Sequence, residues 1–551
     1  MKAYKGKSQV GLKGEIAVWF SSLGLSLGLL MIVALLGVIA YNGLSVFWPK
    51  RVIQVEFDPQ PASDLGSRSV VAGIITSQKT KSPDSVEEWR LLVGNKDQYG
   101  ISFTYFDRGS LLNVTQPEGL LVLERTAYGK AIGYPEHISG PTGKIISAEH
   151  PNFAQRLGSL VKECQDRGKE IRKLETREIG AIHEALENLR LHQLRLERQS
   201  ELNSEDREAL ERIDEERARY ESLFTTLATR ARLLRDLQIS HKLHYRLASG
   251  EEIDLPIGEI HQFFYPYKIG FSGRAAVFWN HIKEFLLSEP REANTEGGVF
   301  PAIFGTFVMT LFMCVIVTPF GVLAAIYLCE YAKDGVFVRL VRIAINNLAG
   351  VPSIVFGVFG LGFFVYWVGG TLDQLFFSLR LPTPTFGTGG ILWASLTLAL
   401  MTVPVVIVAT EEALTAVSPG LRESSMACGA SRWQTIQRIV LPASAPGVLT
   451  GMILAMARGA GEVAPLMLLG VVKIAPSLPL DDQFPFLHLD RKFMHLGFHI
   501  YDLGFQSPDS EAALPMVFAT TLLLIVLVVV LNLAAILIRN RLRRKYQMAG
   551  F

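Results

Sequence analysis

Long apolar stretches alternate with polar segments along the chain, and six of them have the length of a membrane-crossing helix. The hydrocarbon core of a bilayer is about 30 Å thick, so a helix needs roughly 20 mainly apolar residues to cross it. Such stretches lie at residues 17–41, 302–328, 349–369, 390–410, 445–471 and 514–538. The pattern predicts six transmembrane helices, in which Gly and Pro are tolerated because neighbouring helices satisfy the freed backbone groups.

Residues 42–300 interrupt this apolar pattern and contain two long amphipathic segments at about 152–247. Apolar side chains recur there at intervals of three and four, first at Ile171, Leu174, Ile182, Leu186 and Leu189 and then, after a break, at Leu210, Ile213, Tyr220, Leu223, Leu227, Leu234 and Leu237. This period is that of a helix with one apolar face, so we expect an antiparallel helical hairpin. Asn203 or Ser204, at the break, can cap the second helix by accepting hydrogen bonds from its first amides.

The flanks of the hairpin, residues 50–150 and 248–275, have a different pattern. Short runs such as Val52–Phe57, Ser69–Ile75 and Gly119–Glu124 alternate with Gly, Pro and Asp, which is typical of strands joined by turns. The expected fold is therefore an all-α polytopic membrane protein with six transmembrane helices, whose long insertion carries a helical hairpin and a small β-rich part.

Lys and Arg beside the apolar stretches predict the orientation of the chain, because these residues are enriched on the cytoplasmic side. They precede the first stretch at Lys2, Lys5, Lys7 and Lys13 and follow the last at Arg539, Arg541, Arg543, Arg544 and Lys545. We therefore expect residues 1–16 and 539–551 in the cytoplasm, together with the basic loops 329–348 and 411–444. The same parity places residues 42–300 in the periplasm. Because the first stretch is longer than the apolar core of a signal peptide, we interpret it as an uncleaved anchor.

The composition agrees with a membrane protein that also has a large water-exposed part, since 49% of the 551 residues are hydrophobic and 19% are charged. A net charge of +2 argues against a nucleic-acid-binding protein, which would carry a basic excess. Three of the four cysteines, Cys314, Cys329 and Cys428, lie in or beside apolar segments, so no disulfide framework is indicated.

A distinctive pattern lies between the fourth and fifth apolar stretches. It reads Glu423-Ser-Ser-Met-Ala-Cys-Gly429 and is followed after nine residues by Ile439-Val-Leu441-Pro442. Physically, it describes a short helix, a turn at Gly429 and a second short helix stopped by Pro442. The pattern resembles the EAA loop of ABC importer permeases, E-A-A-x3-G-x9-I-x-L-P, with serines in place of the two alanines. The resemblance implies that this loop docks on a cytosolic ATPase and moves with it, through Glu423, Ser424, Ser425, Gly429, Ile439, Leu441 and Pro442.

Four further segments narrow the resemblance, namely Glu296–Thr306, Pro319–Tyr327, Asn347–Gly357 and Ala457–Pro465. Together they are similar to the PstA family of phosphate permeases, closely over residues 296–538 but not over the long insertion. The resemblance implies a MetI-like permease core, residues 301–538, that forms half of a pathway for inorganic phosphate in a bacterial inner membrane. The implied partners are membrane lipid, a second permease (PstC-like), two copies of a cytosolic ATPase (PstB-like) and a periplasmic phosphate-binding protein (PstS-like).

Arg458 and Glu462 stand four residues apart in an otherwise apolar stretch. At this spacing they share one helix face and can pair, and charges within a membrane usually face a bundle interior or an aqueous path. In one interpretation the guanidinium fork of Arg458 binds phosphate oxygens while Glu462 orients or gates it. In the other, the pair only fixes helix packing. The family often has a second arginine where this chain has Val408, so the resemblance supplies no two-arginine relay within this subunit.

No nucleotide-binding motif accompanies these patterns. The sequence lacks a G-x-x-x-x-G-K-[ST] loop to cradle ATP, and it has neither an H-E-x-x-H nor a CxxC arrangement. We therefore expect a transport subunit, not an enzyme, with no cofactor of its own and with ATP bound by a partner ATPase. The alternatives are a permease for another oxyanion or small solute, a membrane sensor or assembly protein suggested by the hairpin, and, third, an enzyme acting within the membrane.

Overall fold

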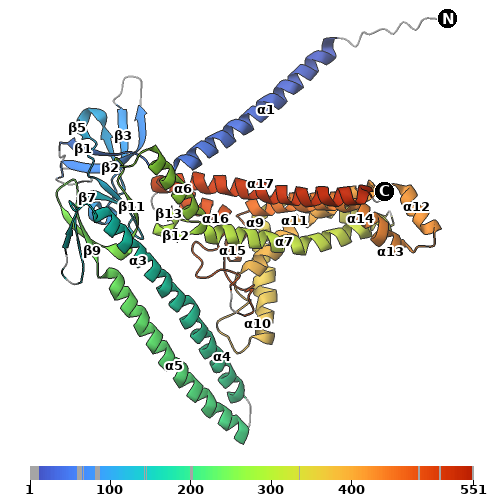
Figure 1. Cartoon of the computed structure of the whole chain (residues 1–551). Helices are drawn as coiled ribbons and strands as arrows, with labels where there is room; N and C mark the ends of the chain where they lie inside the picture. The colour runs from blue at the N-terminus through green and yellow to red at the C-terminus, as the bar shows by residue number, and fades with distance from the viewer. Residues whose placement is uncertain are drawn as a thin grey trace.

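The computed structural model describes residues 12–58, 65, 68–80, 87–141, 143, 145–198, 203–333, 335–481, 484–507 and 510–548. A bundle of long helices carries a β module at one end and a small helical loop at the other, and a helical hairpin extends from the module (Figure 1). Most of the predicted cytoplasmic segment 1–16, with Lys2, Lys5 and Lys7, lies outside the described residues, as do residues 549–551.

The six predicted transmembrane helices are confirmed as Val18–Ser45, Phe300–Tyr331, Ser353–Phe376, Ile391–Thr415, Arg432–Gly461 and Ala512–Arg541, each long and apolar enough to cross a membrane. Their elements are α1 (Leu12–Ser45), α7 (Phe300–Ile326) with the π-turn η5 (Tyr327–Tyr331), α9 (Ser353–Phe359) with η6 (Gly360–Gly369) and α10 (Gly370–Phe376), α11 (Ile391–Thr415), α13 (Arg432–Thr435) with η7 (Ile436–Val440) and α14 (Leu441–Gly461), and α17 (Ser510–Met548).

The fifth of these helices differs most from its predicted bounds of 445–471. It begins at Arg432 and ends at Gly461, where Glu462 adopts an extended conformation with φ −78° and ψ 137°. Pro465 follows three residues later and has no N–H with which to continue a helix, so the apolar run that the sequence offers beyond Gly461 is not one helix.

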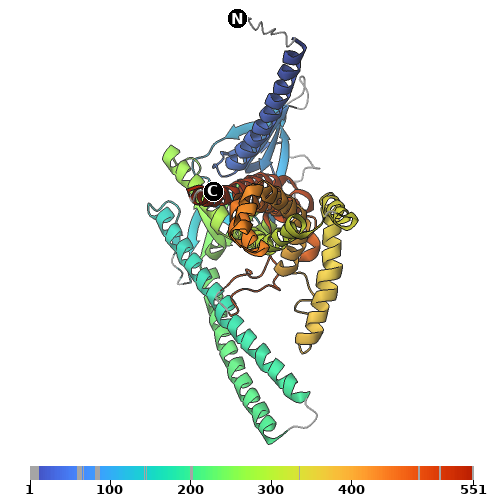
Figure 2. The same cartoon turned by 90° about the vertical axis from the view of Figure 1, so that its right-hand side faces the viewer.

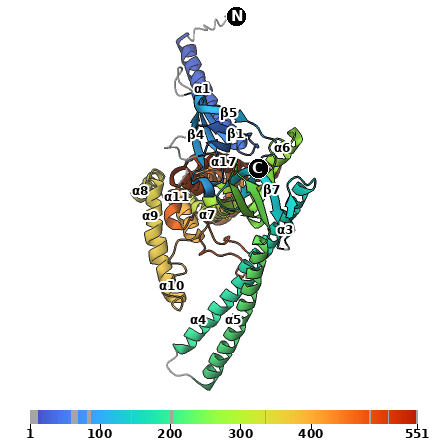
Figure 3. The same cartoon turned by 90° about the vertical axis from the view of Figure 1, so that its left-hand side faces the viewer.

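Helix α11 lies at the centre of the bundle, and two-thirds of its most apolar 18-residue segment is buried. None of the most apolar 18-residue segment of α1 is buried. The C-terminal end of α1 meets α17 near Gly43, which lies against Phe518 and Leu522, and the N-terminal part of α1 projects away from the bundle (Figure 1). Seen along the bundle, α1 and the hairpin project to opposite sides (Figures 2 and 3). The long apolar surface of α1 is therefore open to lipid or to another chain.

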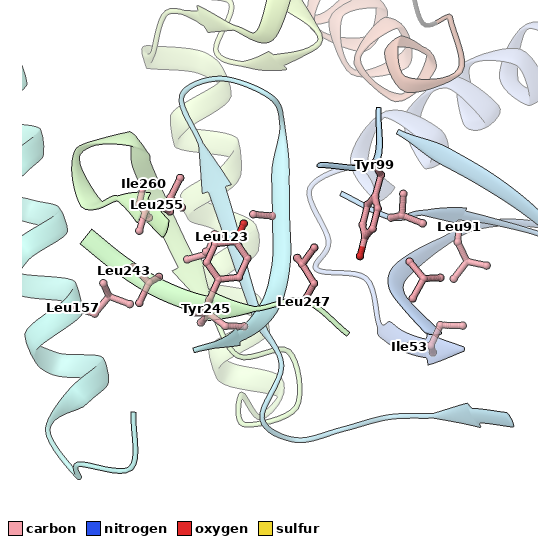
Figure 4. Close-up of a cluster of buried hydrophobic side chains, with 14 of the residues drawn as sticks. Ile53, Leu91, Tyr99, Leu123, Leu157, Leu243, Tyr245, Leu247, Leu255 and Ile260 are labelled. Atoms are coloured by element: carbon pink, nitrogen blue, oxygen red, sulfur yellow. The ribbon is translucent and has the colours of Figure 1, made fainter. Parts of the chain in front are cut away.

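Two antiparallel sheets form the β module, with strand orders β4-β3-β2-β1-β5 and β10-β9-β7-β6-β11, and β8 pairs with β7. The strands are β1 (Val52–Phe57), β2 (Val70–Thr80), β3 (Glu87–Leu92), β4 (Phe103–Asp107), β5 (Leu111–Thr115), β6 (Leu121–Arg125), β7 (Lys130–Ser139), β8 (Ile145–Ser147), β9 (Lys242–Arg246), β10 (Glu252–Pro256) and β11 (Ile260–Phe264). Ile53 of the first sheet, Tyr245 of the second and Leu157 of the first hairpin helix belong to one apolar core (Figure 4). The insertion therefore has a core of its own.

The predicted helical hairpin consists of α3 (Phe153–Lys173), the π-turn η2 (Leu174–Ile179) and α4 (Gly180–Glu197), which together run antiparallel to α5 (Ser204–Ile239). At the start of α5, the Asn203 N–H donates a hydrogen bond to Oδ2 of Asp206 (3.0 Å), so Asn203 is the capping position. The hairpin ends at Ile239 and not at residue 247, because Leu243 and Tyr245 alternate with more exposed residues in β9 and fill the module core.

Short elements join these parts. The module leads into α7 through α6 (Phe271–Leu287) and the strand pair β12 (Pro290–Arg291) and β13 (Glu296–Gly297). The others are α2 (Lys96–Tyr99), α8 (Val336–Leu348), α12 (Pro419–Ala427), α15 (Leu466–Leu469), α16 (Leu496–Tyr501), and the turns η1 (Arg108–Ser110), η3 (Ile257–Glu259), η4 (Glu292–Asn294) and η8 (Asp502–Gln506).

Candidate functional site

The loop between α11 and α14, which contains α12 and α13, is the small helical element at the end of the bundle opposite the β module (Figure 1). We call it the coupling loop, residues 416–440. Helix α12 ends at Ala427, and Gly429, two residues later, has φ +87°, a conformation that glycine adopts without steric cost. The Ala430 N–H then donates to the Ser425 carbonyl oxygen (3.2 Å), which closes the turn. The sequence pattern predicts this turn.

The prediction that a second short helix stops at Pro442 is wrong. The helix that begins at Arg432 continues through Pro442 to Gly461 without a break. Pro442 lies two residues beyond the end of the π-turn η7, at the second position of α14. In an α-helix each N–H donates to the carbonyl four residues earlier, and proline has no N–H to donate. The wider π-turn just before Pro442 relaxes this hydrogen-bond pattern, so the helix accommodates the proline. The second half of the coupling loop is thus the first part of a membrane helix.

The two serines that replace alanines in the EAA pattern have different surroundings. Ser425 is buried, and its hydroxyl lies 2.9 Å from that of Thr435, which is also buried. This hydrogen bond joins α12 to α13 across the Gly429 turn. Ser424 is exposed and donates to the Gly420 carbonyl oxygen (2.7 Å) within its own helix, and Glu423 beside it is exposed as well. Glu423 and Ser424 are therefore free to meet another protein.

Apolar side chains hold the loop against the bundle. Ile436 and Val440 are buried in a cluster with residues of α7, η5 and α11, and Leu441 is half-buried beside it. Ile439 is also partly covered. The predicted loop residues therefore divide into an exposed group at the end of α12 and an anchored group on η7 and α14.

Two ion pairs that the sequence analysis missed lie where the coupling loop meets the bundle. Nη2 of Arg422 is 3.0 Å from Oε1 of Glu330, and Nη2 of Arg342 is 3.6 Å from Oε1 of Glu411. The only sequence signal was a charge at the end of an apolar stretch, because the partners are far apart in the chain. A third missed group is Asp373, which is buried and accepts hydrogen bonds from the Phe386 N–H (2.9 Å) and the Gly387 N–H (2.7 Å).

Arg458 and Glu462 form an ion pair, with Nε and Oε1 3.6 Å apart. The expectation that they share one helix face is wrong, because α14 ends at Gly461 and Glu462 is the first extended residue beyond it. The pair lies at the end of α14 farther from the coupling loop, and its side chains are 35% and 20% exposed. It is thus a partly exposed charge pair at a helix end, and Arg458 lies about 26 Å from Leu441 along the helix at 1.5 Å per residue.

The remaining signature segments shape the packing of the bundle. A Cβ on Gly357 would lie 2.7 Å from Cα of Pro465, so only glycine allows α9 to approach the segment after α14 this closely. Val408, on α11, is partly exposed. Within the described residues, no group of three or more His, Cys, Asp or Glu side chains could hold a metal ion.

A sequence model of the family described as "Binding-protein-dependent transport system inner membrane component" matches residues 317–546. Phosphate transport system permease protein PstA 1 of Mycobacterium tuberculosis is 34% identical over 262 residues, 48% of this chain and 76% of that protein. PstA of Yersinia pestis is 35% identical over 251 residues, 46% of this chain and 75% of that protein. PstA of Mycobacterium leprae is 35% identical over 192 residues, 35% of this chain and 56% of that protein.

Proposed function

This chain belongs to the family of inner-membrane components of binding-protein-dependent transport systems, and from that premise we propose that it is a permease subunit of an ATP-driven importer of inorganic phosphate. It is a multi-pass membrane protein and a transport subunit. The observation that carries the phosphate assignment is its similarity to proteins named as phosphate permeases, about a third identical over three-quarters of the length of two of them. The compact coupling loop supports the link to an ATPase.

We propose the partners that such a subunit needs. The exposed end of α12, with Glu423 and Ser424, would dock on one copy of a cytosolic, PstB-like ATPase, and a second, PstC-like permease would carry the other copy. A PstS-like binding protein would deliver phosphate. The open apolar surface of α1 suits membrane lipid or the second permease. Full ATP-driven uptake by this chain and the ATPase, without a second permease, would contradict the two-permease arrangement.

The proposed orientation has both termini and the coupling loop in the cytoplasm and the β module with its hairpin in the periplasm. Arg422, Arg432 and Arg438 give the coupling-loop end of the bundle the positive charge expected of a cytoplasmic face. The β module and the coupling loop lie at opposite ends of the bundle, as this orientation requires (Figure 1). Labelling of single introduced cysteines by a membrane-impermeant reagent in intact cells tests it.

We propose that Arg458 contributes to anion specificity at the periplasmic side of the pathway. It lies at the far end of α14 from the coupling loop, and it is partly exposed, so solute can reach it. A guanidinium binds phosphate oxygens with two parallel N–H donors, which an ammonium cannot do. Glu462, beyond the helix end, would hold that fork in place when no phosphate is bound.

Phosphate uptake measured in a strain without other phosphate importers tests these proposals. Arg458→Ala should reduce uptake by about tenfold or more. Uptake by Arg458→Lys should lie between that of the wild type and that of Arg458→Ala, because lysine keeps the charge but loses the guanidinium fork. Glu462→Gln should leave the complex assembled with reduced or uncoupled uptake. Arg541→Ala, near the end of α17, is the matched control.

Two results would contradict the proposals separately. Unchanged uptake kinetics in Arg458→Ala would remove the specificity role and leave the transport function intact. The absence of binding-protein-dependent phosphate uptake by the wild-type complex, with uptake of another solute, would overturn the phosphate assignment.

A further inference from the structure

Both helices of the coupling loop place an arginine on the same end of the second membrane helix. Arg422 of α12 pairs with Glu330 of η5 at 3.0 Å. The guanidinium carbon of Arg432, the first residue of α13, lies 5.8 Å from the centre of the ring of Tyr331, the last residue of η5. Two consecutive residues at the end of one helix thus contact the two halves of a loop that lies about 90 residues farther along the chain.

Arg422 binds a third element as well. Besides Glu330, its guanidinium donates to the carbonyl oxygens of Leu414 (2.7 Å) and Val417, at and just beyond the end of α11. The carbonyls of the last helical turn lack the usual i+4 amide partner, and the Leu414 carbonyl accepts only a turn-type bond from the Val417 N–H (3.2 Å), so Arg422 adds side-chain donors at this helix end. One side chain therefore connects α12, η5 and α11.

The surroundings make the Arg422–Glu330 pair stronger than a surface ion pair, whereas Arg432 and Tyr331 are both exposed. The side chains of Glu330 and Arg422 are only 11% and 21% exposed. Charges that are partly removed from water interact more strongly, and one that loses its partner there is left with a desolvation cost. The second ion pair, Arg342 with Glu411, lies close by, because the Arg342 guanidinium also donates to the carbonyl oxygen of Leu328 in η5 (3.5 Å).

We infer that Glu330, Tyr331, Arg422 and Arg432 form a clamp through which α7 follows the coupling loop. This inference rests on the proposed function, in which an ATPase moves the loop. A displacement of α12 relative to η5 would break the Arg422–Glu330 pair and uncap the end of α11, so the three elements move together. The four residues are positioning residues, because none of them needs to contact solute.

The other end of α7 shows where such a movement would arrive. The Thr306 hydroxyl, in the second turn of α7, accepts a hydrogen bond from the Leu496 N–H (2.9 Å), and both residues are buried. The Val299 N–H donates to the Phe285 carbonyl oxygen (2.8 Å) of α6. Helix α7 thus joins the coupling loop to the segments that lie beneath the β module.

A double-mutant cycle on the purified complex tests the clamp. The variants are Glu330→Gln, Arg422→Ala and the double variant, and the readout is the number of ATP molecules hydrolysed per phosphate transported. Each single variant should raise this ratio by about fivefold or more while the ATPase still co-purifies, and the double variant should be no worse than Arg422→Ala, because both changes break one contact. Arg339→Ala, an exposed cation on α8, should leave the ratio unchanged.

Additive effects of Glu330→Gln and Arg422→Ala on the ratio, or an unchanged ratio in both, would overturn the clamp. If Arg422→Ala does not assemble, Arg422→Gln completes the cycle, since it removes the charge that pairs with Glu330 and keeps a polar side chain. Tyr331→Phe keeps the aromatic face and should retain coupling, whereas Tyr331→Leu should lose part of it. If the wild-type complex transports a solute other than phosphate, the same cycle with that solute still tests the clamp.

Discussion

At the scale of single residues, a backbone conformation and a hydroxyl determine the shape of the coupling loop. A Cβ on Gly429 would meet no atom within 4 Å, so the requirement for glycine there comes from its φ of +87° and not from lack of space. Ser425 then holds α12 to α13 through Thr435. Alanine, which the EAA pattern has at this position, could not make that bond.

Substitutions at Gly429 should therefore rank by their tolerance of the left-handed conformation. Gly429→Asn should keep most ATP-driven uptake, whereas Gly429→Val, which strains the turn by about 1–2 kcal/mol or more, should lose most of it. Uptake and ATPase co-purification are the measurements, and Gly420→Ala in the same loop is the control. Equal effects of Asn and Val would mean that backbone conformation is not what this position requires.

At the scale of elements, the hairpin is held at its two ends. Near its base, Leu157 and Leu160 of α3 belong to the module core. Near its tip, Nη1 of Arg198 lies 3.5 Å from the Ser378 hydroxyl, in the segment after α10. A polar crevice of about 330 Å³ separates α4 from this segment, with Glu187 and Arg380 among its lining residues. The middle of the hairpin is joined by a narrow row of buried apolar side chains, among them Leu174, Ile182 and Ala231, and by exposed ion pairs such as Arg230 with Glu170. The exposed pairs contribute little to stability.

Shortening the hairpin should therefore spare the membrane core. Replacing residues 181–223 with a short Gly/Ser linker keeps α3 and the part of α5 that packs near the module. We propose that the hairpin docks or steers the binding protein, so this variant should assemble and retain basal uptake while its stimulation by the binding protein falls. Loss of assembly would show that the hairpin is structural, and unchanged stimulation would exclude the docking role.

At the scale of the whole molecule, buried charges join the β module to the membrane core. Glu124 of β6 is buried, and its Oε1 lies 3.1 Å from Nζ of Lys130 and 3.4 Å from Nε2 of His281 on α6. Burial alone would raise the pKa of Glu124, but Lys130 and His281 outweigh it and hold the pKa well below its usual value. Burial opposes charge on His281 too, yet the neighbouring carboxylate of Glu124 raises the pKa of His281.

The junction should weaken as the pH rises above neutrality. Because the pKa of His281 is raised, the charged form of His281 stabilises the folded state fully below pH 6.5, the ordinary histidine pKa. This stabilisation is lost as the pH rises through the folded-state pKa. Because the pKa of Glu124 is lowered, its charged form stabilises the folded state fully above pH 4.5, the ordinary glutamate pKa. This stabilisation is lost only as the pH falls from there through the folded-state pKa. The melting temperature of the purified protein should therefore decline on the alkaline side.

His281→Gln should flatten that decline, and His192→Gln, at an exposed position of α4, should not. Thermal unfolding between about pH 5 and pH 9 is the measurement, since this range covers the ordinary histidine pKa. An alkaline decline of the same size in His281→Gln would mean that another group controls the junction.

Periodicity and charge were enough to predict the six membrane helices, the hairpin and the turn at Gly429, because each depends on residues close together in the chain. The continuation of a helix through Pro442 and the end of α14 at Gly461 were not predictable in this way, since packing decides whether a proline is accommodated. Arg422 and Glu330 lie 92 residues apart, and only the tertiary fold brings them into contact. Local patterns set the elements, whereas the connection between the coupling loop and α7 depends on which helix ends the bundle places side by side.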